Sequence, residues 1–152
     1  MADKLKVRLS AACQDKIRAH AVETYPRECC GALLGKDESG VETAEQSREI
    51  LEVMPLENRR EDSPRNRFEV SARDVIDVER TADRRGLQVV GWYHSHPDHP
   101  AKPSQYDRER AWPWYSYIIV SVRKRVATEM KSWRLLDDRG DYAEEEIEVV
   151  KE

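Results

Sequence analysis

Apolar side chains alternate with charged ones near the start of the chain and then recur at helical spacing. Residues 5, 7 and 9 are apolar between charged or polar neighbours, a pattern typical of a half-buried strand. Ser10 is a suitable N-cap for a helix, which is expected to continue to about Tyr25 before Pro26 stops it. The sequence therefore begins with a predicted strand and helix.

A second helix has clear signals at both ends. Ser71 and Asp74 have the spacing of a capping box, apolar residues follow on one helical face, and Gly86 supplies a C-terminal stop. Residues 87–93 are then nearly all apolar, which predicts a strand buried on both faces. The polar sequence that starts at His94 is therefore expected at the end of this strand, at the edge of the core.

The remaining segments predict several strands and one long loop. Residues 29–35 suggest a compact apolar strand, and residues 41–56 suggest a partly exposed pair of strands. Residues 57–67 are polar and lack periodicity, as in a loop. Beyond a short helix over residues 104–111, three strands are expected near residues 115–122, 128–136 and 147–150. Helices and strands thus intermix without strict alternation, which predicts an α+β fold.

Composition narrows the class of protein. The 152 residues suit one domain, expected to span residues 1–152. Charged residues make up 37% of the chain with a net charge of only -4, so no large basic surface is expected for nucleic acid. Three cysteines give a poor basis for disulfides, and neither a signal peptide nor a membrane span is recognised. We expect a cytoplasmic protein without membrane association.

Three of the four histidines lie within residues 94–99. Alternate residues of a strand point to the same side, so His94 and His96 can bind one metal ion together. A catalytic zinc takes three protein ligands, and the candidates for the third are Asp98, His99 and Asp107. Asp98 follows proline too closely to fold back easily, whereas Asp107 lies one turn into the helix that is expected to begin near residue 104.

The order His-x-His, seven residues, Ser, two residues, Asp resembles the signature of the JAMM (MPN+) metallopeptidases. The stretch Pro26–Gly35 is similar to the segment that carries the catalytic glutamate of that family, and the resemblance covers most of the chain. It implies a three-layer MPN/JAB domain in which helices flank a mixed β-sheet, as in cytidine deaminases.

The resemblance also implies a role for each site residue. His94, His96 and Asp107 would bind one zinc ion, while Glu28 would take the proton of the zinc-bound water and pass it to the leaving amine. Ser104 would stabilise the oxyanion. From the residues alone, Ser104 could instead be a helix N-cap, a role that does not exclude catalysis, and Glu28 could be an ordinary loop carboxylate.

The family implies hydrolysis of a peptide or isopeptide bond after the Gly-Gly tail of a ubiquitin-like protein. Short bacterial members resemble this chain, and many act on ThiS-like sulfur-carrier proteins, as CysO-cysteine peptidases do. We therefore expect a ubiquitin-like or sulfur-carrier substrate, with deconjugation of a bacterial ubiquitin-like modifier as the alternative. Residues 57–67 are a candidate cover for the tail. A homodimer is possible, and the sequence leaves the oligomeric state open.

Three other functions fit part of the sequence. The string from His94 to His99 also matches His-x-His-x-Asp-His of the metallo-β-lactamase superfamily, which needs further histidines downstream that this chain lacks. Nucleoside deaminases need a Pro-Cys-x-x-Cys pair, which is also missing. A non-catalytic MPN scaffold usually lacks part of the motif. All five motif residues are present here, so the sequence favours an enzyme.

Overall fold

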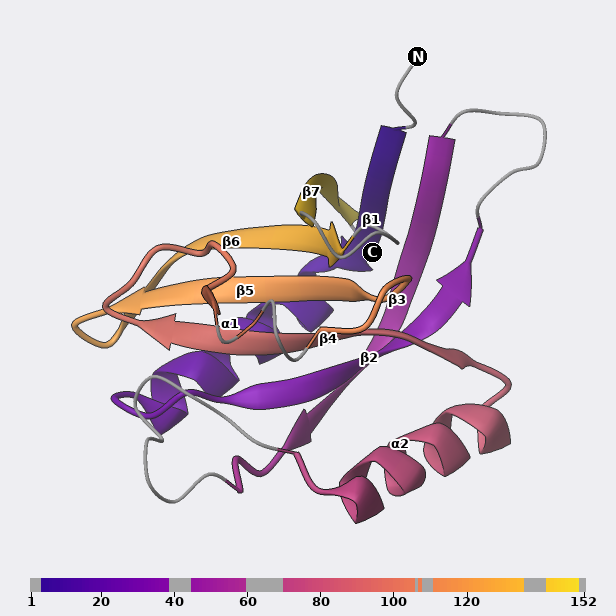
Figure 1. Cartoon of the computed structure of the whole chain (residues 1–152), viewed down its shortest axis with the longest axis horizontal. Coiled ribbons are helices and arrows are strands. Elements are labelled where there is room, and N and C mark those ends of the chain that lie inside the picture. The colour runs from indigo at the N-terminus through magenta and orange to yellow at the C-terminus, as the bar shows by residue number, and fades with distance from the viewer. Residues whose placement is uncertain are drawn as a thin grey trace.

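The computed structural model describes residues 4–38, 45–59, 70–105, 107, 111–135 and 142–150. The elements within them are, in chain order, β1 (Lys4–Ser10), α1 (Ala11–Thr24), β2 (Cys30–Asp37), β3 (Glu45–Leu56), α2 (Ala72–Arg84), β4 (Gln88–Pro97), β5 (Ser116–Arg123), β6 (Val126–Leu135) and β7 (Tyr142–Val150) (Figure 1). Neither described helix has the length and apolar character needed to cross a membrane.

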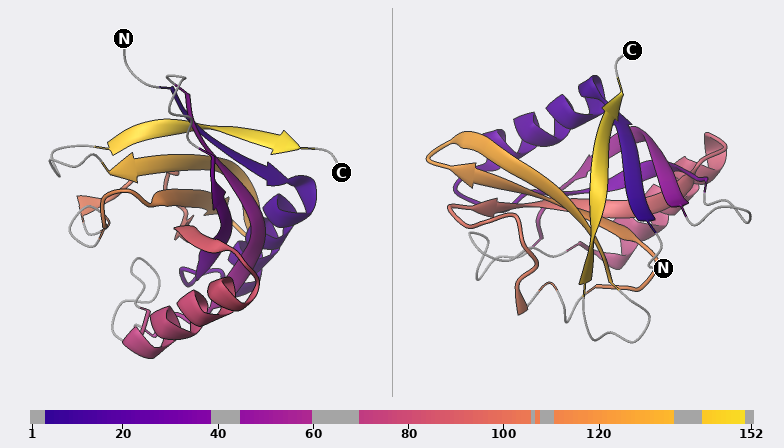
Figure 2. Two further views of the ribbon diagram at one scale, coloured as in Figure 1. Left: turned by 90° about the vertical axis from the view of Figure 1, so that its right-hand side faces the viewer. Right: turned by 90° about the horizontal axis from the view of Figure 1, so that it is seen from above.

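The strands form one mixed sheet that closes on itself in the order β1-β3-β2-β4-β5-β6-β7. Three pairs are parallel, namely β1 with β3, β1 with β7, and β4 with β5, and the other neighbours are antiparallel. The pairing of β1 with β7 closes the sheet, and Figure 2 shows these two strands side by side. The α+β class and the mixed sheet agree with the sequence prediction, whereas the closure was not predicted.

The two helices pack on opposite faces of the sheet. The N-cap of α1 is Ser10, whose hydroxyl accepts a hydrogen bond from the amide of Cys13, and the apolar face of the helix belongs to a core cluster that includes residues of all seven described strands. α2 packs on the outer face through Val78 and Ala82, against apolar residues of β2, β3 and β4. The expected helix-sheet-helix arrangement is therefore confirmed, with α1 inside the curve of the sheet.

Both helix boundaries follow the signals that the sequence carries. Ser71 and Asp74 form the expected capping box at the start of α2, and Gly86 has a positive φ of 68° just beyond its end. Pro26 follows the C-cap residue Tyr25 of α1. Propensity and local hydrogen bonding were sufficient to place both helices.

Two strand predictions need correction. Residues 45–56 form the single strand β3 rather than a pair, because β1 pairs with its first half on one side and β2 pairs along the other side. β4 continues to Pro97, so His94 and His96 lie within the strand rather than after it. Pairing with both β2 and β5 keeps this polar segment extended. Most of the loop predicted at 57–67 lies outside the described residues.

The inner face of the sheet also holds a buried charged cluster. Arg48 of β3 is only 1% exposed and donates to the hydroxyl of Ser116 on β5 at 3.0 Å. That hydroxyl donates to Glu145 of β7 at 3.0 Å, and Glu145 also accepts hydrogen bonds from Arg134 and Ser132 of β6. The cluster therefore links strands that are not neighbours in the sheet.

Candidate metal site

Strand β4 fixes the positions of His94 and His96. It is paired with β2 on one side and with parallel β5 on the other, and its register places His94 opposite both Cys30 and Ile119. The two histidines are buried and point to the same side of the strand, with their Nε2 atoms 3.2 Å apart. The predicted His-x-His pair is therefore brought together as expected.

Asp107 supplies a third donor atom to the same point. Its Oδ2 lies 3.1 Å from Nε2 of His96 and 3.2 Å from Nε2 of His94, and the residue is buried. Donor atoms bound to zinc at tetrahedral angles, with bonds of about 2.0–2.1 Å, lie about 3.3–3.4 Å apart. The three donor atoms therefore fit one zinc ion closely.

A capping box holds Asp107 in this position. The amide of Ser104 donates to Oδ2 of Asp107 at 2.8 Å, and the amide of Asp107 donates to the hydroxyl of Ser104 at 3.1 Å. A helical hydrogen bond of 2.9 Å follows, from the amide of Ala111 to the carbonyl of Asp107. Ser104 thus has the N-cap geometry, while its exposed hydroxyl keeps a proton that it can donate. Residues 106 and 108–110 of the predicted helix lie outside the described residues.

A hydrogen bond to the backbone orients His96. Its Nδ1 lies 2.8 Å from the carbonyl of Pro100. A carbonyl can only accept, so Nδ1 donates to it, and Nε2 is the ring nitrogen that faces Asp107 and His94. Metal-binding histidines commonly use such an outer contact to fix the tautomer and the ring orientation.

Glu28 is the fourth polar residue at the site. It is buried, and one of its carboxylate oxygens lies within 4.8 Å of ligand atoms of His94 and His96. Burial, together with the smaller effect of the charge of Asp107, raises the pKa of Glu28 from 4.5 to about 9. Glu28 and Asp107 are therefore the two carboxylates that could complete a metal site with His94 and His96. Oδ2 of Asp107 lies 3.1–3.2 Å from the Nε2 atoms of both histidines.

The two carboxylates have opposite pKa shifts. Burial alone would raise the pKa of Asp107, but the charges and hydrogen bonds of His94 and His96 outweigh it and hold the pKa well below its ordinary value. Asp107 is therefore ionised at neutral pH and suited to bind a cation. Glu28 in the metal-free protein is suited to hold a proton.

Asp98 and His99, the other candidates for the third ligand, do not join the site. The carboxylate of Asp98 accepts from the hydroxyl of Tyr25 at 2.6 Å and from the amide of Lys124 at 3.0 Å. The hydrogen bond of Tyr25, followed by that of Lys124, lowers the pKa of Asp98. His99 is exposed, and its carbonyl accepts from the hydroxyl of Ser121 at 2.5 Å. Both residues therefore make their contacts within the loop that follows β4 and with its neighbours.

Sequence reasoning missed the residues that hold the segment around Glu28. The amide of Cys29 donates to the hydroxyl of Ser95 at 2.8 Å, and the amide of Ser95 donates back to the carbonyl of Cys29 at 3.2 Å. The side chain of Asn58 donates to the carbonyl of Glu28 at 3.1 Å. The position of Ser95 between His94 and His96 could have pointed to this role. Side chains alternate along a strand, so that of Ser95 is directed to the face of β4 opposite to the two histidines.

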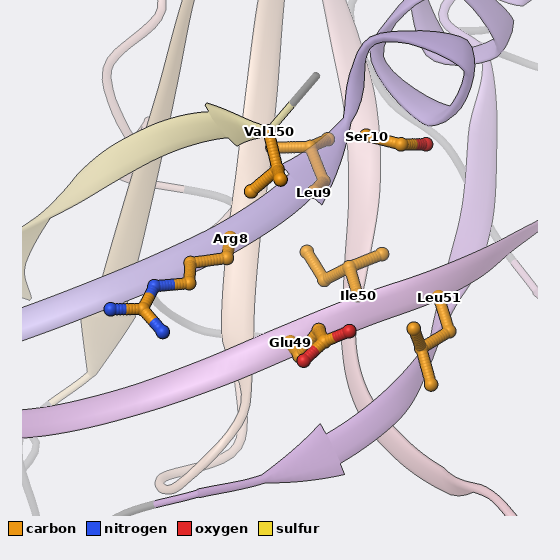
Figure 3. Close-up of a pocket in the computed structure, with 7 residues that line it drawn as sticks. All are labelled: Arg8, Leu9, Ser10, Glu49, Ile50, Leu51 and Val150. Atoms are coloured by element: carbon orange, nitrogen blue, oxygen red, sulfur yellow. The ribbon is translucent and has the colours of Figure 1, made fainter. Parts of the chain in front are cut away.

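A surface pocket of about 380 Å³ lies elsewhere, where β1 leaves β3 and turns into α1 (Figure 3). Its polar side chains are those of Arg8, Ser10 and Glu49, and Val150 of β7 completes the wall. None of the four residues of the metal site lines it. Its lining brings together no cluster of metal ligands.

Two histidines and an ionised carboxylate that converge beside a second buried carboxylate define the class of site found in metal-dependent hydrolases. A family model described as prokaryotic homologs of the JAB domain matches residues 10–136. The chain therefore belongs to the JAB/MPN family, and the resemblance noted in the sequence is confirmed.

Individual relatives agree with this assignment. The chain is 34% identical over 126 residues to a Haloferax volcanii protein named desampylase, covering 80% of this chain and 84% of that one. It is 30% identical over 108 residues to a Thermus thermophilus protein named as a TtuB-protein conjugate cleaving protease, covering 71% and 65% respectively. The solution structure of a Desulfitobacterium hafniense protein matches with a TM-score of 0.81 and 30% identity, covering 96% of this chain and 94% of that one.

Proposed function

We propose that this protein is a zinc-dependent metallopeptidase that cleaves the peptide or isopeptide bond after the C-terminal Gly-Gly of a ubiquitin-like or sulfur-carrier protein. The observation that carries the proposal is the triangle of donor atoms from His94, His96 and Asp107, with edges of 3.1–3.2 Å. Glu28 lies beside it, with a carboxylate oxygen within 4.8 Å of ligand atoms of both histidines, and we assign it the role of proton carrier rather than ligand. This is the residue set that metal-assisted hydrolysis requires.

Each residue has a distinct task in the proposed reaction. His94, His96 and Asp107 hold the zinc, which when bound polarises the substrate carbonyl and makes water more acidic. Glu28 accepts a proton from the attacking water as its oxygen bonds to the carbonyl carbon, and then donates that proton to the amine as the C–N bond breaks. Burial suits Glu28 to this double role, because it makes the protonated form accessible near neutral pH.

Ser104 is proposed to donate its hydroxyl proton toward the carbonyl oxygen as negative charge develops there. Its hydroxyl oxygen already accepts the amide of Asp107 at 3.1 Å, which fixes it one helical turn from the ligand. Capping and oxyanion stabilisation are therefore compatible. Removal of one oxyanion donor typically lowers kcat by about 10²- to 10³-fold.

The substrate class rests on the relatives and on the site together. A desampylase and a TtuB-conjugate cleaving protease are among the similar proteins, and both names describe removal of a protein modifier. A glycine pair suits the buried ligands, because the absence of Cβ atoms lets a substrate backbone pass close to them. Deconjugation of a modifier and release of a short product from a sulfur carrier are two forms of the same hydrolysis.

The proposal is tested with two substrates that share one ubiquitin-like domain ending in Gly-Gly. In one the tail is joined to a peptide through an α-amine, and in the other through a lysine side chain. Mass spectrometry should find cleavage directly after Gly-Gly, lost on chelation and restored by zinc. If neither substrate is cleaved by zinc-loaded protein, the chain is better explained as a binding scaffold.

A further inference from the structure

The residues on either side of Glu28 are attached at two places, one in β4 and one at Asp98 directly after it. At one, the amide of Cys29 donates to the hydroxyl of Ser95 at 2.8 Å and its carbonyl accepts from the amide of Ser95 at 3.2 Å. At the other, the hydroxyl of Tyr25 donates to the carboxylate of Asp98 at 2.6 Å. We call residues 25–29 the Glu28 arm.

Ser95 is the buried part of this attachment. It is 0% exposed and lies between the two histidines, and its side chain points to the face of β4 opposite to theirs. Cys29 is also buried, at 1% exposed, so its amide could not exchange the serine hydroxyl for water without opening the structure. One strand thus presents the metal ligands on one face and holds the Glu28 arm from the other.

Asp98 adds a second, more exposed attachment. Its backbone has a left-handed φ of 57°, and each of its carboxylate oxygens has a different partner. One oxygen accepts from Tyr25 at the start of the Glu28 arm, and the other accepts from the amide of Lys124 in the turn between β5 and β6. Asp98 therefore joins the arm to two neighbouring parts of the chain.

We infer that Ser95, assisted by the Tyr25–Asp98 pair, is a positioning residue that sets the placement of Glu28 relative to the metal ligands. The inference rests on the proposed function, since it assigns Ser95 a part in that reaction. Ser95 does not touch substrate or metal in this role. It acts through Cys29 on the carboxylate, where a displacement of about 1 Å costs up to about 10²-fold in rate.

The test compares Ser95→Ala with Ser132→Ala. Both serines are 0% exposed, both lie in strands and both form a side-chain hydrogen bond, but that of Ser132 is with Glu145, far from the histidines. The two substitutions should lower thermal stability to a similar degree. Only Ser95→Ala should lower kcat, by about 10- to 100-fold, with KM and zinc content unchanged.

Hydrogen exchange separates this inference from the proposed function, because it needs no substrate. In zinc-loaded protein, Ser95→Ala should speed exchange in peptides that contain Cys29, whereas Ser132→Ala should not. If wild-type protein cleaves no Gly-Gly fusion, the proposed function fails while the exchange result still tests the attachment.

Tyr25→Phe provides a milder second variant that removes only the hydroxyl donated to Asp98. It should give a smaller loss of kcat, again without loss of zinc. The inference is wrong if Ser95→Ala keeps wild-type kcat or leaves exchange at Cys29 unchanged. If Ser95→Ala does not fold, a wild-type kcat in Tyr25→Phe overturns it and a reduced kcat at constant KM supports it.

Discussion

Glu28 and Asp107 lie at one site, and their surroundings give the two carboxyl groups opposite preferences for a proton. Asp107 is placed between two histidines, which stabilise its charge more than burial penalises it. Glu28 is buried and lies near the negative charge of Asp107, and both conditions favour its neutral form. With a cation on the three ligands, the pKa of Glu28 falls, because a nearby positive charge favours the carboxylate. Metal binding and the protonation of Glu28 are therefore coupled.

This coupling predicts how pH affects the metal-free protein. The pKa of Glu28 is about 9 when folded and 4.5 as the ordinary value, so the folded state binds the extra proton between these limits. The contribution of Glu28 to stability is fully present below the ordinary pKa of 4.5 and is lost as the pH rises through the folded-state pKa of about 9. Glu28→Gln removes this dependence. Urea unfolding of metal-free protein should show the variant increasingly more stable than wild type from about pH 5 to 9. Parallel curves would contradict the burial of Glu28.

Asp107→Asn tests the third ligand. The amide keeps the shape but lacks the negative charge, so zinc affinity should fall by more than the roughly 10- to 100-fold that loss of an outer contact costs. Metal content after dialysis against a weak chelator measures this. Asp98→Asn is the control and should retain zinc, since its carboxylate is directed at Tyr25 and Lys124. A fully loaded Asp107→Asn variant would transfer the third position to Glu28.

At the level of elements, β4 carries the site and depends on a close fit to β5. A Cβ added at Gly91 would collide with the backbone carbonyl of Ser116, its partner in β5. The same parallel pairing continues to His94 and His96, opposite Ile119 and Ser121. The placement of the two histidines therefore depends on the close approach of β4 to β5, which only a glycine at position 91 permits.

Gly91→Ala should accordingly weaken both folding and zinc binding. Overpacking of this kind costs about 1–3 kcal/mol, and a shift of β4 against β5 would move the histidines away from Asp107. Gly86→Ala is the matched control. It has a positive φ of 68° and open space around it, so alanine there costs about 1–2 kcal/mol in backbone strain and leaves the site intact. Equal zinc affinities in the two variants would argue against the role given to this strand pair.

Sequence patterns predicted the positions of helices and strands along the chain better than they predicted which segments contact one another. Caps at Ser10 and Ser71 and the apolar run before His94 gave both helices and β4, because these signals depend on nearby residues. The proposed ligands could be picked out because motif spacing encodes their order along the chain. The parts played by Ser95 and Asn58 were missed, since each depends on a contact with a segment distant in sequence.

For the whole molecule, closure of the sheet buries a charged cluster on its inner face. One member, Arg48, lies in residues 41–56, which the sequence predicted to be partly exposed. Glu145 is 1% exposed and accepts hydrogen bonds from Ser116, Ser132 and Arg134, and Arg48 donates to the same Ser116. Charged side chains in a mixed polar segment are normally exposed, so Arg48 gave no sign of burial. The pairing of β1 with β7 joins residues some 140 positions apart, which local patterns do not reveal.

Glu145→Ala tests this cluster. The substitution leaves the guanidinium groups of Arg48 and Arg134 without a nearby carboxylate of the cluster. Removal of one member of a buried ion pair typically lowers the free energy of unfolding by about 3–5 kcal/mol. Equilibrium unfolding in urea measures the loss. Glu148→Ala, also in β7, removes an exposed carboxylate that pairs with Lys6 and Arg8 at the surface, and it should change stability little. Equal effects from the two variants would mean that the cluster contributes nothing special to the fold.

Glu28 is proposed to transfer the proton in a hydrolysis carried out at His94, His96 and Asp107. The most direct test is the turnover of a Gly-Gly fusion by zinc-loaded wild type and zinc-loaded Glu28→Gln, with the zinc content of each sample measured. We predict one zinc per chain in both proteins and a loss of kcat of at least about 10²-fold in the variant. A Glu28→Gln protein that carries zinc and retains wild-type kcat would contradict the account.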